Sequence, residues 1–206
     1  MAEVASVHIL SSTFIVFSLL FSSCFLASEA VSKAGDEETH DVFGRTLDPN
    51  QMGLKKEKLS HFRFFWHDIV SGKNPSSIEV IRSPIKNSSL LLGFGLVHMF
   101  DNRLTISGDI NSKLVGRAQG FYAQADMDEL ALLVAQNFLF LEGKYNGSTI
   151  TVLGRNQILN TVRELPIVGG SGAFRFARGY IQARTYSFDL NTLDATVEYN
   201  VYVLHY

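Results

Sequence analysis

Residues Arg163 to Tyr180 read RELPIVGGSGAFRFARGY. A short apolar run, Leu165 to Val168, ends in Gly-Gly-Ser-Gly at 169–172, and an alternating run follows it. Three glycines in four residues allow a sharp turn through positive φ. Alternation is typical of a strand with one buried face. The stretch therefore predicts strand, glycine turn and strand. The expected second strand carries Phe174, Phe176 and Tyr180 on one face. The stretch also holds charges that a plain hairpin does not need: Arg163, Glu164, Arg175 and Arg178.

The same period-two pattern recurs along most of the chain from His61 onward. It predicts strands over 61–70, 78–81, 93–100, 113–125, 130–142, 148–155 and 196–206. We expect Asp101-Asn102 to turn the chain after the third of these strands. About eight strands with short turns and no helix indicate an all-β antiparallel barrel or sandwich. Pairing of the first strand with the last would close the sheet, and an eight-stranded barrel can hold one small ligand.

Composition excludes several classes of function. At 206 residues the chain is long enough for one domain with a real core. The net charge of −2 gives no strong field for nucleic acid or an anionic membrane surface. The sequence holds no P-loop, GxGxxG or CxxC motif, and its histidines lack the spacing of a metal site. We expect no metal and no cofactor.

The N-terminal 30 residues predict a secretory signal peptide. Ile9 to Leu26 is apolar and serine-rich, and small residues precede a cleavage point after Ala30. The other interpretation is an uncleaved membrane anchor, which the serines make less favourable. Residues 31–58 are polar and aperiodic, so we expect a variable, flexible segment before a domain over 59–206. Two glycosylation sequons, at Asn87 and Asn146, fit a secretory route.

Three residues have patterns that suit catalysis, each with a plainer explanation. Asp68 shares a strand face with Phe62, Phe64 and Trp66, where poor solvation would raise its pKa, or it is a strand-end aspartate bonded to a turn amide. Arg163 could stabilise a phenolate in a dry pocket, or form a salt bridge with Glu164. Tyr122 could donate a proton or stack on a substrate ring, or it is ordinary core.

Five ordered blocks of the sequence resemble plant dirigent proteins. The blocks are HFRFFWHDIVSGKNPSS, FDNRLT, VGRAQGFY, GKYNGSTITVLGRN and RELPIVGGSGAFRFARGY, and the resemblance covers His61 to Tyr206. It implies an eight-stranded antiparallel β-barrel of the dirigent and allene-oxide-cyclase type, secreted, often glycosylated and trimeric. It also implies binding of phenoxy radicals or quinone methides, made by a laccase or peroxidase, with control of stereochemistry. The SGKNP, EGKYNGSTI and GRN segments are most similar to the non-lignan branch, whose legume members include pterocarpan synthases.

The resemblance implies that Asp68 and Arg163 are catalytic and that Tyr122 faces the cavity. Two positions depart from the lignan-forming pattern: Asn156 stands where that pattern has an aspartate, and Gln124 where it has a second tyrosine. We expect both to contact the substrate by hydrogen bonds, but neither can transfer a proton as a carboxyl or a phenol does. The loss favours dehydration of an isoflavanol over lignan coupling. A non-catalytic phenolic carrier and a structural cell-wall or defence protein remain as alternatives.

Overall fold

A computed structural model describes residues 46–54, 56–83 and 93–206. The predicted signal peptide, most of the segment 31–58 and the sequon at Asn87 lie outside the described residues. Apart from Thr46, the described residues belong to one compact unit, Leu47–Tyr206. Within them, no helix is long and apolar enough to cross a membrane.

The unit is built from strands and two short 3-10 turns. The strands are β1 (Lys58–Asp68), β2 (Ser77–Ile81), β3 (Val97–Thr105), β4 (Leu114–Gln124), β5 (Ala131–Phe140), β6 (Thr149–Gln157), β7 (Arg163–Ser171), β8 (Arg178–Phe188) and β9 (Ala195–His205). The 3-10 turns are η1 (Gly143–Tyr145) and η2 (Gly172–Phe174). Along β5 and β9, buried side chains alternate regularly with more accessible ones, which is the pattern that produced the strand predictions.

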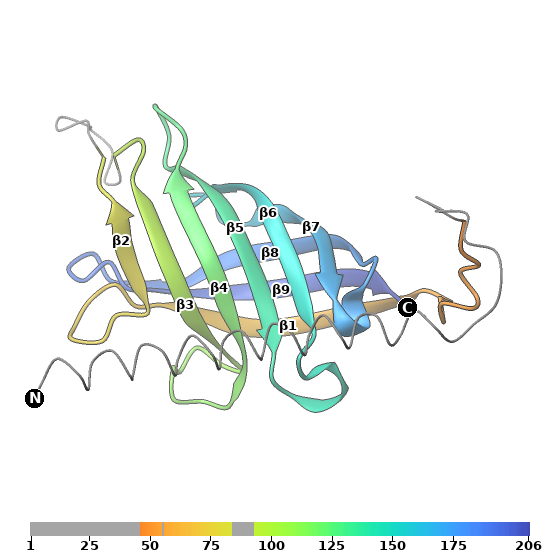
Figure 1. Cartoon of the computed structure of the whole chain (residues 1–206). Coiled ribbons are helices and arrows are strands. Elements are labelled where there is room, and N and C mark those ends of the chain that lie inside the picture. The colour runs from red at the N-terminus through yellow and green to blue at the C-terminus, as the bar shows by residue number, and fades with distance from the viewer. Residues whose placement is uncertain (1–45, 55, 84–92) are drawn as a thin grey trace, which may run out of the picture. The chain divides into compact units, whose positions relative to one another are not determined.

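Eight of these strands close into an antiparallel barrel, as the sequence predicts. The order around the sheet is β1-β9-β8-β7-β6-β5-β4-β3, and β1 also pairs with β3 to close the ring. First and last strands pair along their whole length, from Lys58 opposite His205 to Asp68 opposite Ala195. Strand β2 pairs with Val97–Phe100 of β3, on the same edge of β3 that β1 occupies at Arg103–Thr105. In Figure 1, β3 to β7 cross the front of the barrel, and β1, β8 and β9 form its back.

A close approach of neighbouring backbones bends the barrel wall at Gly120 in β4. A Cβ added there would lie 2.1 Å from the backbone oxygen of Ala135 on β5. No real side chain tolerates that distance, so only glycine lets the two strands come this close. Gly120 therefore sets the close spacing of β4 and β5 in the barrel wall.

Two local predictions are wrong. Asp101 and Asn102 do not turn the chain but lie inside β3, opposite Gln119 and Ala118 of β4. Both polar side chains have partners there, so the strand continues: Asp101 pairs with Arg117 outside the barrel, and Asn102 bonds inside it.

The second error concerns the run after the glycines in the opening stretch. Strand β7 extends through Gly169 and Gly170 to Ser171, and β8 begins only at Arg178. Phe174 is fully buried in η2, whereas Phe176 has φ 61° and is 61% exposed. A left-handed residue breaks the alternation, so Phe174, Phe176 and Tyr180 do not share one strand face.

The two ends of the barrel differ. We call one the closed end: there Phe62, Phe140, Tyr145, Phe174 and His205 pack ring against ring. The other, the open end, is where β1 finishes at Asp68 and β7 starts at Arg163. Aromatic packing fills the first, and the second holds the cavity described next.

Candidate functional site

A cavity of about 690 Å³ lies inside the barrel at its open end. This is within the usual 300–1,000 Å³ range of small-molecule sites. Apolar and aromatic side chains dominate its wall, including Trp66, Phe100, Val134, Val197 and Tyr199. Charged and polar groups interrupt this wall at a few points: Asp68, Glu79, His98, Tyr122, Gln136, Asn156, Asn160 and Arg163. The cavity therefore suits a flat, aromatic ligand with a few oxygen substituents.

Asp68, the last residue of β1, points its carboxyl into this cavity and is 6% exposed. Its Oδ1 accepts from Asn102 Nδ2 at 2.9 Å, and its Oδ2 accepts from the Tyr122 hydroxyl at 3.1 Å. Burial raises the pKa of the Asp68 carboxyl, and these hydrogen bonds oppose part of the rise. A buried carboxyl with a raised pKa can hold a proton for delivery to a ligand.

The plainer explanation of Asp68, a bond to a turn amide, does not hold. That role belongs to Asp194, whose Oδ1 accepts from the backbone amides of Val70 and Ser71 at 2.9 and 3.1 Å. Sequence reasoning missed Asn102, which fixes the orientation of the Asp68 carboxyl, because an Asp-Asn pair suggests a turn. The signal that could have found it is the alternation of His98, Phe100, Asn102 and Leu104 along one face.

Tyr122 of β4 lies in the cavity wall beside Asp68 and is 7% exposed. Burial, and then the charge of Asp68, raise the pKa of its phenol, so Tyr122 stays protonated. Its hydroxyl also contacts Ser77 Oγ at 3.3 Å, and its ring stacks on His98 at 5.1 Å. Tyr122 is thus both a wall residue and a hydrogen-bond donor to the candidate acid.

Arg163 enters the cavity from the start of β7 and is 5% exposed. Its Nε donates to Asn156 Oδ1 at 3.2 Å, and one terminal nitrogen donates to Thr185 Oγ1 at 2.9 Å. Burial lowers the pKa of its guanidinium, which nevertheless stays charged because arginine does not deprotonate in proteins. No carboxylate of the described residues forms an ion pair with it, so the expected alternative, a bridge to Glu164, is absent.

A cation held by neutral partners keeps its field available to a ligand in the cavity. Asn156 contributes to this arrangement by orienting Arg163, and it lines the cavity itself. The substitution of an aspartate by Asn156 therefore has a physical effect: a carboxylate there would neutralise Arg163. Asp68, Tyr122, Asn156 and Arg163 are brought together around one cavity.

Gln124 is the exception among the predicted substrate contacts. It is 1% exposed, and its Nε2 donates to the backbone oxygens of Asp126 and Glu129 at 2.7 and 2.6 Å. Its side chain holds the loop between β4 and β5 and is not part of the cavity wall that the structure defines. The sequence could not separate these roles, since both require a buried amide.

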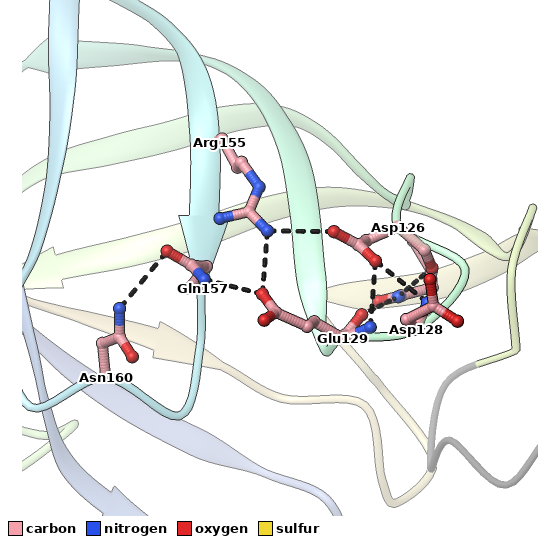
Figure 2. Close-up of polar contacts among 7 residues, drawn as sticks. Asp126, Asp128, Glu129, Arg155, Gln157 and Asn160 are labelled. Carbon is pink, nitrogen blue, oxygen red and sulfur yellow. Dashed lines mark hydrogen bonds and ion pairs between the residues drawn. The ribbon is translucent and has the colours of Figure 1, made fainter.

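The same loop is fastened from outside by a group that we call the rim network: Asp126, Glu129, Arg155 and Gln157 (Figure 2). Arg155 of β6 donates to Asp126 and Glu129, each at 2.9 Å, and Gln157 donates to Glu129 at 2.7 Å. Backbone amides of the loop and Arg155 lower the pKa of Asp126 to about 2. Leu130 and Ile158, next to these residues, line the cavity, so the network fixes part of its entrance.

The described residues contain no group of three His, Cys, Asp or Glu side chains that could hold a metal ion. Asn146, in the second predicted sequon, is exposed directly after η1.

A closed barrel with such a cavity defines a ligand-binding β-barrel with ionisable groups facing its ligand. The chain belongs to the dirigent family: the family described as Dirigent-like protein matches residues 59–204. It is 57% identical over 164 residues to Dirigent protein 7 of Arabidopsis thaliana, covering 80% of this chain and 86% of that protein. It is 48% identical over 162 residues to Pterocarpan synthase 1 of Glycine max, covering 78% and 87% of the two chains.

Solved structures agree with the sequence relatives. The structure of the pterocarpan synthase dirigent protein GePTS1 superposes with a TM-score of 0.73 at 43% identity, covering 79% of this chain and 99% of that one. The resemblance to dirigent proteins and the eight-stranded barrel fold are confirmed.

Proposed function

We propose that this dirigent protein binds an isoflavanol and removes water from it through a quinone methide, with control of the product's stereochemistry. One observation carries the proposal: the buried carboxyl of Asp68 and the buried guanidinium of Arg163 line one aromatic cavity, and Arg163 has no carboxylate partner among the described residues. The similarity to pterocarpan synthases supports the same reaction. The ligand's phenol and benzylic hydroxyl match these two groups in chemistry.

The reaction balances without an oxidant. The Asp68 carboxyl donates its proton to the benzylic hydroxyl, the carbon–oxygen bond breaks, and water leaves. A phenol on the same ring system releases its proton to water and becomes the carbonyl of the quinone methide, next to the Arg163 cation. A second phenol oxygen then attacks the benzylic carbon, and its proton passes through water to the first phenol oxygen, which becomes a phenol again. Asp68 is left ionised and must regain its proton before the next turnover.

The barrel supplies the stereochemical control. Its wall is chiral, and the aromatic side chains of Trp66, Phe100 and Tyr122 line the cavity, where they can pack against one face of a planar intermediate. The second phenol can then attack only from the open face. An intermediate in water would be attacked on both faces, so holding it in the cavity is sufficient for selectivity.

Incubation of the purified protein with separated isoflavanol enantiomers, with and without laccase, tests the proposal. We expect one enantiomer to give pterocarpan without oxidant. Biased coupling of phenols that requires laccase would instead indicate radical capture, and saturable binding with no product would indicate a carrier. If the protein instead has a structural role in the plant cell wall, both isoflavanol binding and product formation should stay at background. Enantiopure pinoresinol from coniferyl alcohol and laccase would contradict the loss of lignan chemistry.

A matched pair of arginine variants shows whether the cavity is responsible. Arg163→Leu removes the cavity cation, and we expect the rate to fall about 10²–10³-fold, as for loss of a fixed donor to a developing oxyanion. Arg184→Leu removes an exposed arginine from β8, next to Thr185, which holds Arg163. Arg184→Leu should leave the rate unchanged. Equal losses in both variants would place the reaction outside the cavity.

Secretion and a trimer are part of the same proposal. The N-terminal apolar run and the exposed Asn146 support a secretory route, which expression in plant cells with glycan analysis would test. Large apolar side chains exposed on the barrel exterior, Ile78, Val80, Met99, Leu133 and Leu153, support an oligomer. Light scattering of the purified protein measures its mass directly.

A further inference from the structure

A continuous set of hydrogen bonds leads from Asp68, at the end of β1, to His98 on β3. Tyr122 donates to Asp68 Oδ2 at 3.1 Å, the Tyr122 hydroxyl contacts Ser77 Oγ at 3.3 Å, and Ser77 Oγ contacts His98 Nδ1 at 3.3 Å. Three elements supply these groups: Tyr122 is on β4, Ser77 opens β2, and His98 is on β3.

The direction of each bond follows from the number of hydrogens available. The only hydroxyl hydrogen of Tyr122 goes to Asp68, so Ser77 must donate to the Tyr122 oxygen. Ser77 then has no hydrogen left, and its contact with His98 requires that Nδ1 carries a hydrogen. All bonds therefore point the same way, from His98 toward Asp68, as an ordered proton-transfer chain requires.

The fold holds His98 in place and leaves it access to solvent. Its ring stacks on Tyr122 at 5.1 Å with 12° between the planes, and its position lies opposite Tyr122 on β4 and Glu79 on β2. His98 is half-buried and lines the cavity next to Glu79, which is exposed and pairs with Arg82. One end of the set is thus buried at Asp68, and the other reaches water.

The charges around His98 suit a group that gains and loses a proton. Burial lowers the pKa of His98, and the carboxylate of Glu79 partly opposes this by raising it. Tyr122, the other titratable group facing the ring, stays protonated. Burial raises the pKa of Asp68, so the two ends of the set come closer in proton affinity than free histidine and aspartate.

We propose that His98 is a positioning and proton-relay residue that returns a proton to Asp68 through Ser77 and Tyr122. One proton moves along each bond: from His98 Nδ1 to Ser77, from Ser77 to Tyr122, and from Tyr122 to Asp68 Oδ2. As the Nδ1 proton leaves, His98 takes up on Nε2 the proton that the substrate phenol released to water, so the ring stays neutral. The inference rests on the proposed function, in which Asp68 gives its proton to the departing hydroxyl.

The test compares two histidines that each stack on a tyrosine. His98→Phe keeps a ring over Tyr122 and removes the nitrogens. The control is His61→Phe, since His61 is exposed on the outside of the barrel and stacks on Tyr202 at 4.7 Å. With isoflavanol as substrate, we expect His98→Phe to lower kcat on the order of tenfold, less than direct loss of a catalytic acid. We expect kcat/KM to stay near wild type, and added imidazole to restore kcat.

A purely structural role for His98 would change kcat and KM together, without rescue by imidazole, and would overturn the inference. A second readout does not depend on turnover. Nitrogen-15 NMR of the histidine rings should show neutral His98 with its proton on Nδ1, and Ser77→Ala should change that tautomer. Neutral His98 protonated on Nε2 in the wild type contradicts the chain. If the wild-type protein makes no pterocarpan, the proposed function fails, and the tautomer measurement still decides whether the hydrogen bonds run from His98 toward Asp68.

Discussion

The two ends of the barrel contain the same three kinds of polar side chain and use them differently. At the closed end Ser60 Oγ lies 2.8 Å from His205 Nε2 and 3.5 Å from the Tyr145 hydroxyl. At the open end Ser77 contacts His98 and Tyr122. His205 is 3% exposed, packs on Phe174 at 5.0 Å, and has its Nδ1 3.1 Å from the Ala173 oxygen. His98 instead borders the cavity.

The difference lies in what surrounds each trio. Rings fill the space around Ser60, Tyr145 and His205, so their hydrogen bonds serve packing alone. Around Ser77, Tyr122 and His98 the aromatic rings leave a cavity open. The carboxyl of Asp68 accepts a hydrogen bond from Tyr122 there. A histidine, a serine and a tyrosine in contact are therefore not by themselves a sign of chemistry. An adjoining cavity and an incompletely neutralised charge make the distinction.

Removal of the open-end carboxyl should give the largest effect on activity. Asp68→Asn keeps the shape but cannot hold a transferable proton, so we expect kcat/KM to fall about 10²–10⁴-fold. Asp101→Asn is the control, because Asp101 is an exposed carboxylate on β3 that pairs with Arg117. Steady-state kinetics with the preferred isoflavanol enantiomer measure both. Retention of more than about a tenth of wild-type kcat/KM in Asp68→Asn would remove Asp68 as the acid.

Truncation of the closed end should instead cost stability. Phe174 is fully buried among four aromatic rings, so Phe174→Ala should lower the free energy of unfolding by about 3–5 kcal/mol. Phe176, two residues on and 61% exposed, gives the matched control. We expect Phe176→Ala to change stability by about 0.5 kcal/mol or less. Urea unfolding measures both, and equal losses would mean that η2 does not seal this end.

These two residues also show what the sequence could and could not reveal. Alternation identified β1, β4, β5, β6 and β9, because a strand with one face in a core leaves a period-two record. It failed across 172–177, where a 3-10 turn and the positive φ of Phe176 move successive side chains off any common face. The pattern of apolar and polar residues along the sequence does not record backbone geometry of that kind.

Site residues follow the same division. Asp68, Tyr122 and Arg163 could be selected from the sequence as candidates, because in each case a charge or a phenol interrupts an apolar face or precedes a glycine turn. Asn102 and Ser77 were not, since each acts only by contact with residues far away in sequence. Gln124 was assigned to the ligand because a buried amide cannot reveal whether it faces a cavity or a loop. Contacts between distant strands carry the information that local patterns lack.

The buried carboxyl at the open end should also make stability depend on pH. Burial raises the pKa of Asp68 above its usual 3.8, so the unfolded chain ionises first as the pH rises. The wild type should therefore lose stability relative to Asp68→Asn between about pH 3 and about pH 7, and the difference should be smallest at the acidic end. Urea unfolding of both proteins across this range provides the measurement. A constant difference would show that Asp68 titrates as an exposed aspartate.

The smallest effect should come from the rim network, which adjoins the open end without facing its ligand. Arg155 is 52% exposed, and solvent screens its pairs with Asp126 and Glu129. Arg155→Ala should therefore leave the free energy of unfolding close to that of the wild type. Gln124 still holds the loop from inside, by two bonds of 2.7 and 2.6 Å.

Arg155→Ala should affect local opening of the loop at 126–129 more than it affects the free energy of unfolding of the whole barrel. Amide hydrogen exchange at 126–129 should become faster, since the loop loses its outer attachment while the barrel keeps its core. Arg63→Ala is the control: Arg63 is 54% exposed and pairs with Glu198 on another part of the wall. It should leave exchange at 126–129 unchanged. Equal exchange in both variants would mean that Gln124 alone fixes this side of the cavity entrance, and that the charges outside it serve solubility.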